Sequence, residues 1–383
     1  MYRMILNETS YFGAGCRETI AVEAMRRGFK KAFFVTDKDL IRFKVADKII
    51  EVFEKNRIPY ELFSDVKANP TIANVQNGVS AFKASGADFI VALGGGSSID
   101  TAKGIGIVVN NPDFADVKSL EGVAATRHKA VPTFALPTTA GTAAEVTINY
   151  VIIDEDAKKK MVCVDPNDIP VVAIVDPELM VSIPPHLTAY QGFDAFFHAA
   201  EGFIANCATP ISDLYALEAI RLIYKYLPVA VADGKNLKAR AKIAWASTLA
   251  GMVEATSSCT SEHSLEHAMS AYYPQLPHGA GLIALSEAYC ETFRHDCTKR
   301  YMKMAEMMTQ KKSNRPSDFI DALITLQKEC KVHSIKLSEF GIQSEDFPKF
   351  LQNARDTMGG LFTLDPRPIT DEEILHIFKN SYK

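Results

Sequence analysis

The sequence predicts an α/β domain over residues 1–182 followed by an all-helical domain over residues 183–383. In the first part, short runs of β-branched and aromatic residues alternate with stretches of helical periodicity, which indicates a parallel sheet with helices on its faces. The second part consists of long helical stretches with almost no strand signal. A chain of 383 residues also exceeds the roughly 100 to 200 residues that are typical of one domain, so two domains are expected.

The expected elements follow one another in regular order along the chain. Strands are predicted at 31–37, 60–66, 87–97 and 131–139, and helices between them at 45–56 and 71–86. After a proline-containing linker, long helices are predicted at 214–232 and 239–255. In a parallel sheet of this kind the ligand crevice lies at the carboxyl ends of the strands, so residues that directly follow a predicted strand are candidates for binding.

Composition excludes several classes of protein. The formal charge of −4 is spread along the chain without a basic face, so nucleic acid is not an expected partner. No window holds 18 uninterrupted apolar residues and the start has no signal-peptide pattern, which predicts a cytoplasmic protein without a membrane span. Seven cysteines without CxxC spacing indicate reduced, mostly buried thiols. The β-prone start "MYRMILNETSYFG" could pair with a second copy as an edge strand.

A glycine-rich stretch, "LGGGSSIDTAKG" at 93–104, follows a predicted strand and opens a helix. Gly95 and Gly96 would let the backbone approach an anion closely, and Ser97 supplies a hydroxyl beside the free amides of the first helical turn. The stretch matches neither G-x-G-x-x-G nor the phosphate-binding loop of NTPases. Taken alone it is equally compatible with a tight strand-to-helix turn.

A second loop adds weight to a phosphate cradle. "LPTTAGTAAEVT" at 136–147 also follows a predicted strand and carries three hydroxyl side chains, Thr138, Thr139 and Thr142. Asp37 ends the first strong strand, where an acid commonly bonds a ribose hydroxyl and repels a 2′-phosphate. Its alternative role is the N-cap of the next helix, and the two roles are not exclusive.

Histidines and one acid in the second half suggest a metal site. In "QGFDAFFHAAEG", Asp194 and His198 are four residues apart on one helix face, where they either satisfy each other or form half of a site. In "SEHSLEHAMSAYYPQLPHGAG", His263 and His267 have the same spacing, and His278 follows a turn. An Asp/His pair, a His/His pair and a further His are typical of a divalent metal held by nitrogen and oxygen ligands.

One competing motif lies in the same stretch. His263, Glu266 and His267 spell H-x-x-E-H, an inverted zinc-protease pattern in which Glu266 would be the general base. A peptidase has no need of Asp194, His198 or two phosphate-binding loops. Glu266 is therefore expected to be a solvated or salt-bridged helix residue, and the metallopeptidase remains a remote alternative.

Together these motifs resemble the group III, iron-containing alcohol dehydrogenases, which share the fold of dehydroquinate synthase and glycerol dehydrogenase. The resemblance runs along nearly the whole chain, through "MILNET", "VTDK", "NPT", "GGGSSIDTAK", "PTTAGTAAEVTINYVI", "GFDAFFHAAEG" and "LPHGAG". Within the family these motifs are most similar to those of the lactaldehyde reductases, also called 1,2-propanediol oxidoreductases. The resemblance implies a metal-dependent, NAD(H)-dependent interconversion of small aldehydes and primary alcohols, by a homodimer or larger homo-oligomer.

The resemblance also implies roles for individual residues. Asp194, His198, His263 and His278 become ligands of one divalent metal, for which Fe(II) is expected first and Zn(II) second. His267 lies beside the metal and becomes the candidate catalytic residue that relays a proton. NAD(H) is expected to contact a set of residues from the first domain: Asp37, Asn69, Gly95, Gly96, Ser97, Asp100, Thr138, Thr139, Thr142 and Lys160.

Two departures from the family pattern concern the substrate half. Ten residues separate His267 from His278, one more than in the lactaldehyde reductases, and "VEATSSCTSE" at 253–262 is far more polar than the glycine- and leucine-rich stretch of those enzymes. A butanol-type or glycerol-type dehydrogenase of the same fold therefore remains an alternative substrate class.

Overall fold

The computed structural model describes residues 2–123 and 126–382. The chain divides into two compact units: one is Met4–Val181, and the other comprises the residues from Ser182 onward together with the first residues of the chain up to Arg3. The first unit is built on sheets with helices on them, and in the described part of the second every regular element is a helix. The predicted combination of an α/β part and an all-helical part is confirmed.

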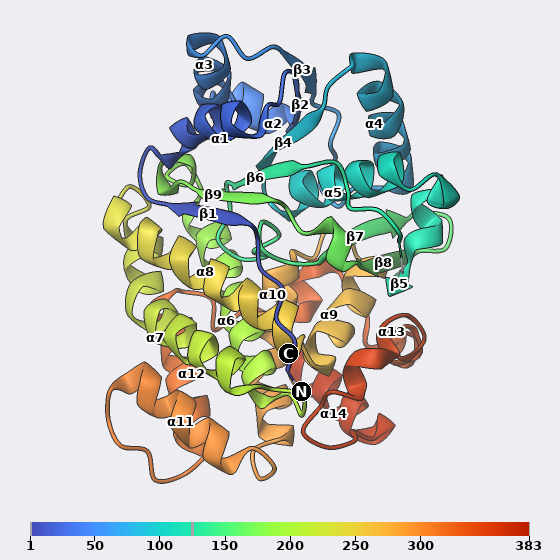
Figure 1. Cartoon of the computed structure of the whole chain (residues 1–383). Coiled ribbons are helices and arrows are strands. Elements are labelled where there is room, and N and C mark those ends of the chain that lie inside the picture. The colour runs from blue at the N-terminus through green and yellow to red at the C-terminus, as the bar shows by residue number, and fades with distance from the viewer. Residues whose placement is uncertain (1, 124–125, 383) are drawn as a thin grey trace. The chain divides into compact units, whose positions relative to one another are not determined.

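A six-stranded parallel sheet forms the centre of the first unit (Figure 1), in the order β1-β9-β6-β4-β2-β3. Its strands are β1 (Thr9–Phe12), β2 (Ala32–Val35), β3 (Tyr60–Phe63), β4 (Phe89–Gly94), β6 (Thr133–Pro137) and β9 (Val172–Val175). The chain moves from β2 outward to β3 and then returns across β2 to β4. Strand order therefore reverses between β2 and β4, and ligands of such sheets bind at the carboxyl ends of strands around this point.

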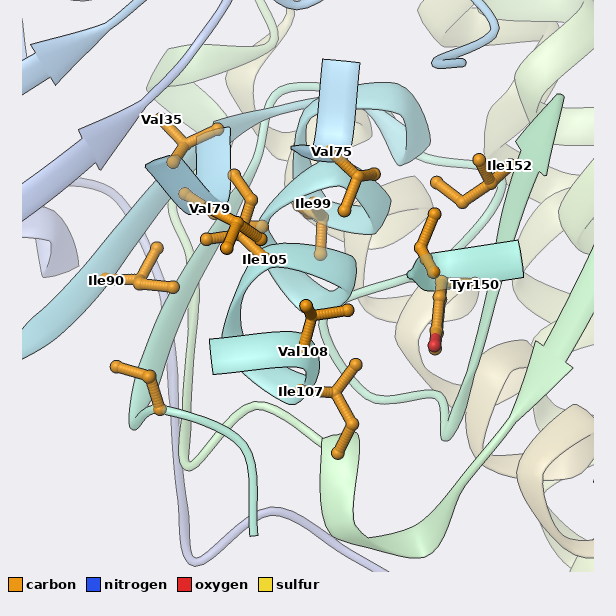
Figure 2. Close-up of a cluster of buried hydrophobic side chains, with 14 of the residues drawn as sticks. Val35, Val75, Val79, Ile90, Ile99, Ile105, Ile107, Val108, Tyr150 and Ile152 are labelled. Carbon is orange, nitrogen blue, oxygen red and sulfur yellow. The ribbon is translucent and has the colours of Figure 1, made fainter. Parts of the chain in front are cut away.

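Helices cover both faces of this sheet and bury its alternating side chains. The helices are α1 (Thr19–Arg27), α2 (Lys38–Arg42), α3 (Asp47–Lys55), α4 (Ile72–Ser85) and α5 (Gly96–Asn110). Val35 and Ile90 pack with α4 and α5 in one hydrophobic cluster (Figure 2), and Phe34 and Val91 pack with α1 and α3 in another. The four inner strands, β2, β4, β6 and β9, are buried along their whole length, as expected for parallel strands that are covered on both faces.

Several features of this unit, strand β9 among them, were not predicted from the sequence. A second, three-stranded sheet has the order β5-β8-β7, with β5 (Gly122–Val123), β7 (Asn149–Asp154) and β8 (Lys159–Val164). The N-terminal run, expected as an edge strand for a second copy, forms β1 instead and pairs in parallel with β9 of its own chain. It still lies at the edge of the six-stranded sheet.

The second unit contains nine α-helices among its described residues. They are α6 (Pro185–Ile204), α7 (Pro210–Ala232), α8 (Leu237–Ser257), α9 (Ser261–Tyr272), α10 (His278–Thr292), α11 (Thr298–Thr309), α12 (Ser317–Glu329), α13 (Phe347–Phe362) and α14 (Asp371–Ser381). Local signals set their starts: Thr209 and Thr370 form capping boxes at the beginnings of α7 and α14. Helices α6, α7 and α8 pack on one another, and α10 packs on both α6 and α9. Helices α7, α8 and α10 thereby pack around α6.

Two expectations drawn from composition can be compared with the structure. Among the described helices, not one combines the length and the apolar character that crossing a membrane requires. All seven cysteines are free thiols, and five of them are buried; Cys207 is exposed and Cys16 is half-buried.

Candidate functional site

The candidate metal ligands come from three helices of the second unit. Asp194 and His198 lie one turn apart on α6, His263 lies in the first turn of α9, and His278 is the first residue of α10. Asp194, His198 and His263 are each 5% exposed or less, although they are polar or ionisable. Helix α6 is otherwise almost entirely apolar around them, so these groups must satisfy one another or bind a ligand.

The imidazole nitrogens converge on one carboxylate oxygen. The Nε2 atoms of His198, His263 and His278 lie 3.6, 3.7 and 3.4 Å from Asp194 Oδ1. The rings of His198 and His263 stack with their centroids 4.7 Å apart. The structure therefore brings together all four residues that the sequence predicted as ligands.

These separations are too long for hydrogen bonds and fit a set of metal ligands. Asp194 Oδ1 and His263 Nε2 are buried without a hydrogen-bond partner among the described residues. A tetrahedral ion held at about 2.0–2.1 Å has ligand atoms about 3.3–3.4 Å apart, close to the spacing seen here. Three imidazoles and one carboxylate also form a suitable donor set for a first-row divalent ion. The residues thus fit the expected metal.

Two buried glutamates lie behind the histidines. Glu201 Oε1 is 2.5 Å from His263 Nδ1, and its other oxygen accepts hydrogen bonds of 2.9 Å from the backbone and hydroxyl of Thr260. Glu266 pairs in the same way with Nδ1 of His278. A carboxylate on Nδ1 fixes the tautomer of the imidazole and directs Nε2 toward a metal. Both rings therefore have the orientation that a metal ligand requires.

The surroundings of Glu266 decide between two expectations from the sequence. It was predicted to be a solvated or salt-bridged helix residue, and its ion pair with His278 confirms the second alternative, with no exposed side-chain area. A general base of a peptidase must reach a water molecule, and a glutamate that is buried against His278 is poorly placed to do so. The geometry therefore argues against the H-x-x-E-H peptidase.

The electrostatics of the cluster favour positive charge at its centre. Burial alone would raise the pKa of Asp194, but the neighbouring histidines, His198 first, hold that pKa well below its usual range. Burial would lower the pKa of His278, whereas Glu266 and then Asp194 raise it to about 9. The negative charge of the buried carboxylates can be compensated either by protons on the histidines or by a divalent ion. Because the ion would replace these protons, metal binding here is expected to release protons.

Two further residues border the cluster. Glu254, on the last turns of α8, places Oε2 3.7 Å from His198 Nε2 with a side chain that is 14% exposed. His267, the predicted catalytic residue, is half-buried and its ring meets that of His278 at a centroid distance of 5.2 Å. It lies beside the four candidate ligands and one turn after His263 on α9.

In the first unit, the two predicted phosphate-binding loops lie against each other. Strands β4 and β6 are neighbours, with Gly94 in register with Pro137. A Cβ atom on Gly95 would lie 2.9 Å from Thr139 Cγ2, and one on Gly96 would lie 3.0 Å from Thr142 Cγ2. The glycines are therefore required by the close approach of the two loops, and the amides at the start of α5 remain near the threonine hydroxyls.

The other predicted cofactor residues occupy defined places around these loops. Asp37 caps α2 by accepting a hydrogen bond of 2.8 Å from the Leu40 amide, so its alternative role is realised. The backbone N–H of Asn69, a residue with a positive φ of 57°, donates to the Ser97 hydroxyl at 3.2 Å. Three others complete the set: Asp100 accepts from the Val151 amide, Thr138 donates its amide to Gly94 O, and Lys160 lies in β8, 9% exposed.

The sequence analysis missed the supporting roles of the glutamates around the site. Glu201 lies three residues after His198 in an apolar helical run, and this burial of an acid beside a candidate ligand was a usable signal. Glu262, whose pKa is raised well above its usual range by burial and then by the charge of Glu201, had no comparable signal. Glu254 lies in the segment 253–262 that was recognised as unusually polar, although its own role was not.

Comparison with known protein families covers both units of the chain. Residues 7–177 match the family model described as iron-containing alcohol dehydrogenase. Residues 188–382 match the model described as the C-terminal part of the Fe-containing alcohol dehydrogenase family. Lactaldehyde reductase of Escherichia coli (strain K12) is 38% identical over 388 residues, which cover 99% of each chain.

Other relatives extend the range of small substrates. The 1,3-propanediol dehydrogenase of Citrobacter freundii is 33% identical, over 100% of this chain and 99% of its own. A crystal structure of a 1,3-propanediol oxidoreductase superposes with a TM-score of 0.94 at 32% identity, covering 100% of both chains. The sulfoacetaldehyde reductase of Bifidobacterium kashiwanohense, solved in complex with NAD+, has a TM-score of 0.89 at 28% identity, over 99% of this chain and 98% of its own.

Proposed function

Because this chain belongs to the iron-containing alcohol dehydrogenase family and is accordingly an alcohol dehydrogenase, we propose that it interconverts small aldehydes and primary alcohols with NAD(H). Lactaldehyde and 1,2-propanediol represent the proposed substrate class. The observation that carries the proposal is the convergence of three histidine Nε2 atoms within 3.4–3.7 Å of one buried carboxylate oxygen.

We propose that Asp194, His198, His263 and His278 hold one divalent ion, Fe(II) in the first place and Zn(II) in the second. When bound, the ion polarises the oxygen of an aldehyde or alcohol, and the nicotinamide accepts or donates the hydride. Asp194 stays ionised and offsets part of the positive charge, as the lowered pKa of its carboxyl indicates.

The buried glutamates have a positioning role in this proposal. Glu201 and Glu266 accept the Nδ1 protons of His263 and His278, so that each Nε2 lone pair faces the centre of the site. Outer carboxylates of this kind raise the basicity of their imidazoles, and their loss typically lowers metal affinity about 10- to 100-fold.

His267 is the proposed proton carrier. Its ring packs edge-on against that of His278, and it is half-buried rather than enclosed, so it can exchange protons with solvent. The unperturbed pKa of an imidazole lies near neutrality, which suits the transfer of a proton to an alkoxide and back. His267→Ala is expected to retain the metal and to lose turnover.

We propose that the loops after β4 and β6 bind the NAD(H) phosphates. The supporting features are the free amides at the start of α5 and the adjacent hydroxyl-bearing side chains of Thr138, Thr139 and Thr142. Asn69, Asp100 and Lys160 are proposed as further contacts. Asp37 would repel the 2′-phosphate of NADP(H), so Asp37→Gly should raise activity with NADPH relative to NADH. An unchanged ratio of the two activities would mean that Asp37 acts only as the N-cap of α2.

The test of the activity is NADH oxidation with lactaldehyde, propionaldehyde and butyraldehyde, each with chelator, Fe(II) or Zn(II). Absence of NADH oxidation by every aldehyde under every metal condition would refute the dehydrogenase proposal. His263→Ala and His278→Ala should abolish stoichiometric metal binding. His376→Ala, at an exposed position of α14, is the matched control and should keep its metal.

A glycerol-type or butanol-type specificity is the second candidate. The similarity to 1,3-propanediol dehydrogenases and the polar segment 253–262 favour substrates with a second hydroxyl group. Comparing kcat/KM for glycerol, 1,3-propanediol, 1,2-propanediol and 1-butanol separates these classes.

We also propose a cytoplasmic homodimer or larger homo-oligomer, as the family resemblance implies. Strand β1 lies at the sheet edge and offers its outer backbone groups for pairing with a second copy. Light scattering of the purified protein measures the oligomeric state, and a monomer at micromolar concentration would refute this part of the proposal.

A further inference from the structure

A second acid, Glu254, lies beside the metal-facing atoms without occupying the position of a ligand. Its Oε2 atom is 3.7 Å from His198 Nε2. Asp194 Oδ1, by contrast, lies 3.4–3.7 Å from the Nε2 atoms of His198, His263 and His278 alike. The carboxylate in the middle of the nitrogens is therefore Asp194, and Glu254 approaches the group from the side of His198 only.

The side chain of Glu254 is partly accessible, whereas the other acids of the site are not. It is 14% exposed, compared with 5% for Asp194, 1% for Glu201 and 0% for Glu266. The helix that carries it ends at Ser257, and the half-buried hydroxyl side chains of Thr256 and Ser258 follow closely in the chain. Glu254 thus makes the edge of the cluster beside His198 anionic.

We propose that Glu254 determines substrate specificity, by selecting small alcohols and aldehydes that carry a hydrogen-bond donor, either hydroxyl or ammonium, two or three bonds from the reacting carbon. This inference rests on the proposed function, because it requires that the alcohol oxygen binds among the three Nε2 atoms. Glu254 Oε2 is 3.7 Å from His198 Nε2, a separation that the three-carbon chain of such a substrate would be long enough to span. A hydroxyl or ammonium group donates to it, whereas a methyl group at the same place leaves the carboxylate partly desolvated without a donor from the substrate.

The same charge should exclude anionic substrates. A carboxylate or sulfonate on the substrate would be repelled by Glu254 at short range in a site with little water. One structural relative is a sulfoacetaldehyde reductase, whose aldehyde carries a sulfonate. This chain is expected to discriminate against that aldehyde because of Glu254.

The experiment uses three alcohols of similar size: 1,3-propanediol, 3-amino-1-propanol and 1-butanol. The metal-loaded protein is compared with Glu254→Gln and Glu254→Leu, and with Glu291→Gln on the exposed face of α10 as the control. For each protein we would measure kcat/KM, the equilibrium dissociation constant of each alcohol by calorimetry, and the bound metal by mass spectrometry.

The wild-type protein is expected to prefer 1,3-propanediol and 3-amino-1-propanol over 1-butanol by about 10- to 100-fold, the range for a hydrogen bond to a charged group. Glu254→Leu should abolish this preference in both kcat/KM and dissociation constant. Glu254→Gln keeps an acceptor oxygen without the charge, so it should lose the preference for the ammonium and retain most of that for the hydroxyl. Glu291→Gln should behave like the wild type.

Three results would overturn the inference. Loss of metal from Glu254→Gln would show that Glu254 is a metal ligand. If the variants keep their metal and their preference among the three alcohols is unchanged, Glu254 has no role in specificity. Equal dissociation constants for the three alcohols in the wild type would also refute it. If no alcohol or aldehyde is turned over, the proposed function fails, while the dissociation constants still decide whether Glu254 selects donors. If Glu254→Leu does not fold, the conservative Glu254→Gln decides the outcome.

Discussion

Replacing Asp365 with asparagine should change the pH dependence of stability. The difference in stability between the variant and the wild type should shift in favour of the variant as the pH rises from acid to alkaline. Asp365 is 2% exposed, and its Oδ1 accepts hydrogen bonds of 2.9 Å from the Ser261 amide and 3.1 Å from the Tyr289 hydroxyl. Burial is the largest cause that raises the pKa of this carboxyl, from 3.8 to about 6. An asparagine side chain keeps an acceptor oxygen for both donors and has no charge to bury.

The magnitude follows from the shift in pKa. The folded protein holds the Asp365 proton between pH 3.8 and about 6, where the unfolded chain has lost it, so this group's stabilising effect falls as pH rises through that window. A shift of about two pKa units corresponds to about 3 kcal/mol, of which about 2.5 kcal/mol is expressed between pH 4 and pH 8. If the asparagine also changes the hydrogen bonding by a constant amount, that amount is the same at both pH values. It therefore cancels when the variant-minus-wild-type difference at pH 4 is subtracted from that at pH 8.

The assay is thermal unfolding of Asp365→Asn and wild type, both with chelator, at pH 4 and pH 8. The variant-minus-wild-type difference in Tm should rise by about 5–10 °C toward pH 8, because each kcal/mol shifts Tm by about 2–4 °C in a unit of this size. A difference that does not change between the two pH values would refute the reasoning, whatever its sign.

Two other substitutions test the backbone around the site. In Gly279→Ala the new Cβ would lie 2.1 Å from the Tyr190 carbonyl oxygen, so α10 must move away from α6. Loss of bound metal and destabilisation by about 1–3 kcal/mol are expected in metal analysis and thermal unfolding, whereas Gly359→Ala, with open space around it, should show neither. Ser258 has φ 62° and ψ −175°, a conformation essentially restricted to glycine, so Ser258→Gly should raise stability by about 1 kcal/mol. Ser258→Ala retains the strain, and an equal gain from it would contradict this account.

The larger features of the fold could be predicted from the sequence because they rest on local patterns. The strands at 32–35, 60–63, 89–94 and 133–137 were found from β-branched and aromatic runs, and the helices α3 and α4 between them from periodicity. The hairpin of β7 and β8 was missed, since the connection between the two strands, residues 155–158, contains no glycine, proline or asparagine and so lacks a strong turn signal. The placement of β1 beside β9 depends on pairing across more than 150 residues of chain, which no local pattern encodes.

In the site, residue type and helical spacing identified the groups that face its centre. Asp194 and His198 share a helix face, and His278 follows a proline that starts a new helix, so their convergence could be anticipated. Of the supporting carboxylates, Glu254 and Glu266 could not be found in this way. Glu266 reaches His278 across a turn of chain, and Glu254 reaches His198 from another helix, so only the packing of α6, α8, α9 and α10 reveals them.

The convergence of α6, α9 and α10 on Asp194 also ties together distant parts of the chain. An ion held by Asp194 and His278 would act as a cross-link that encloses a loop of about 80 residues, and a covalent link across a loop of that length restricts the unfolded chain by about 4–5 kcal/mol. The lifetime of the protein in a cell should then follow the supply of its metal, because chains made without the ion would open more often and be degraded sooner.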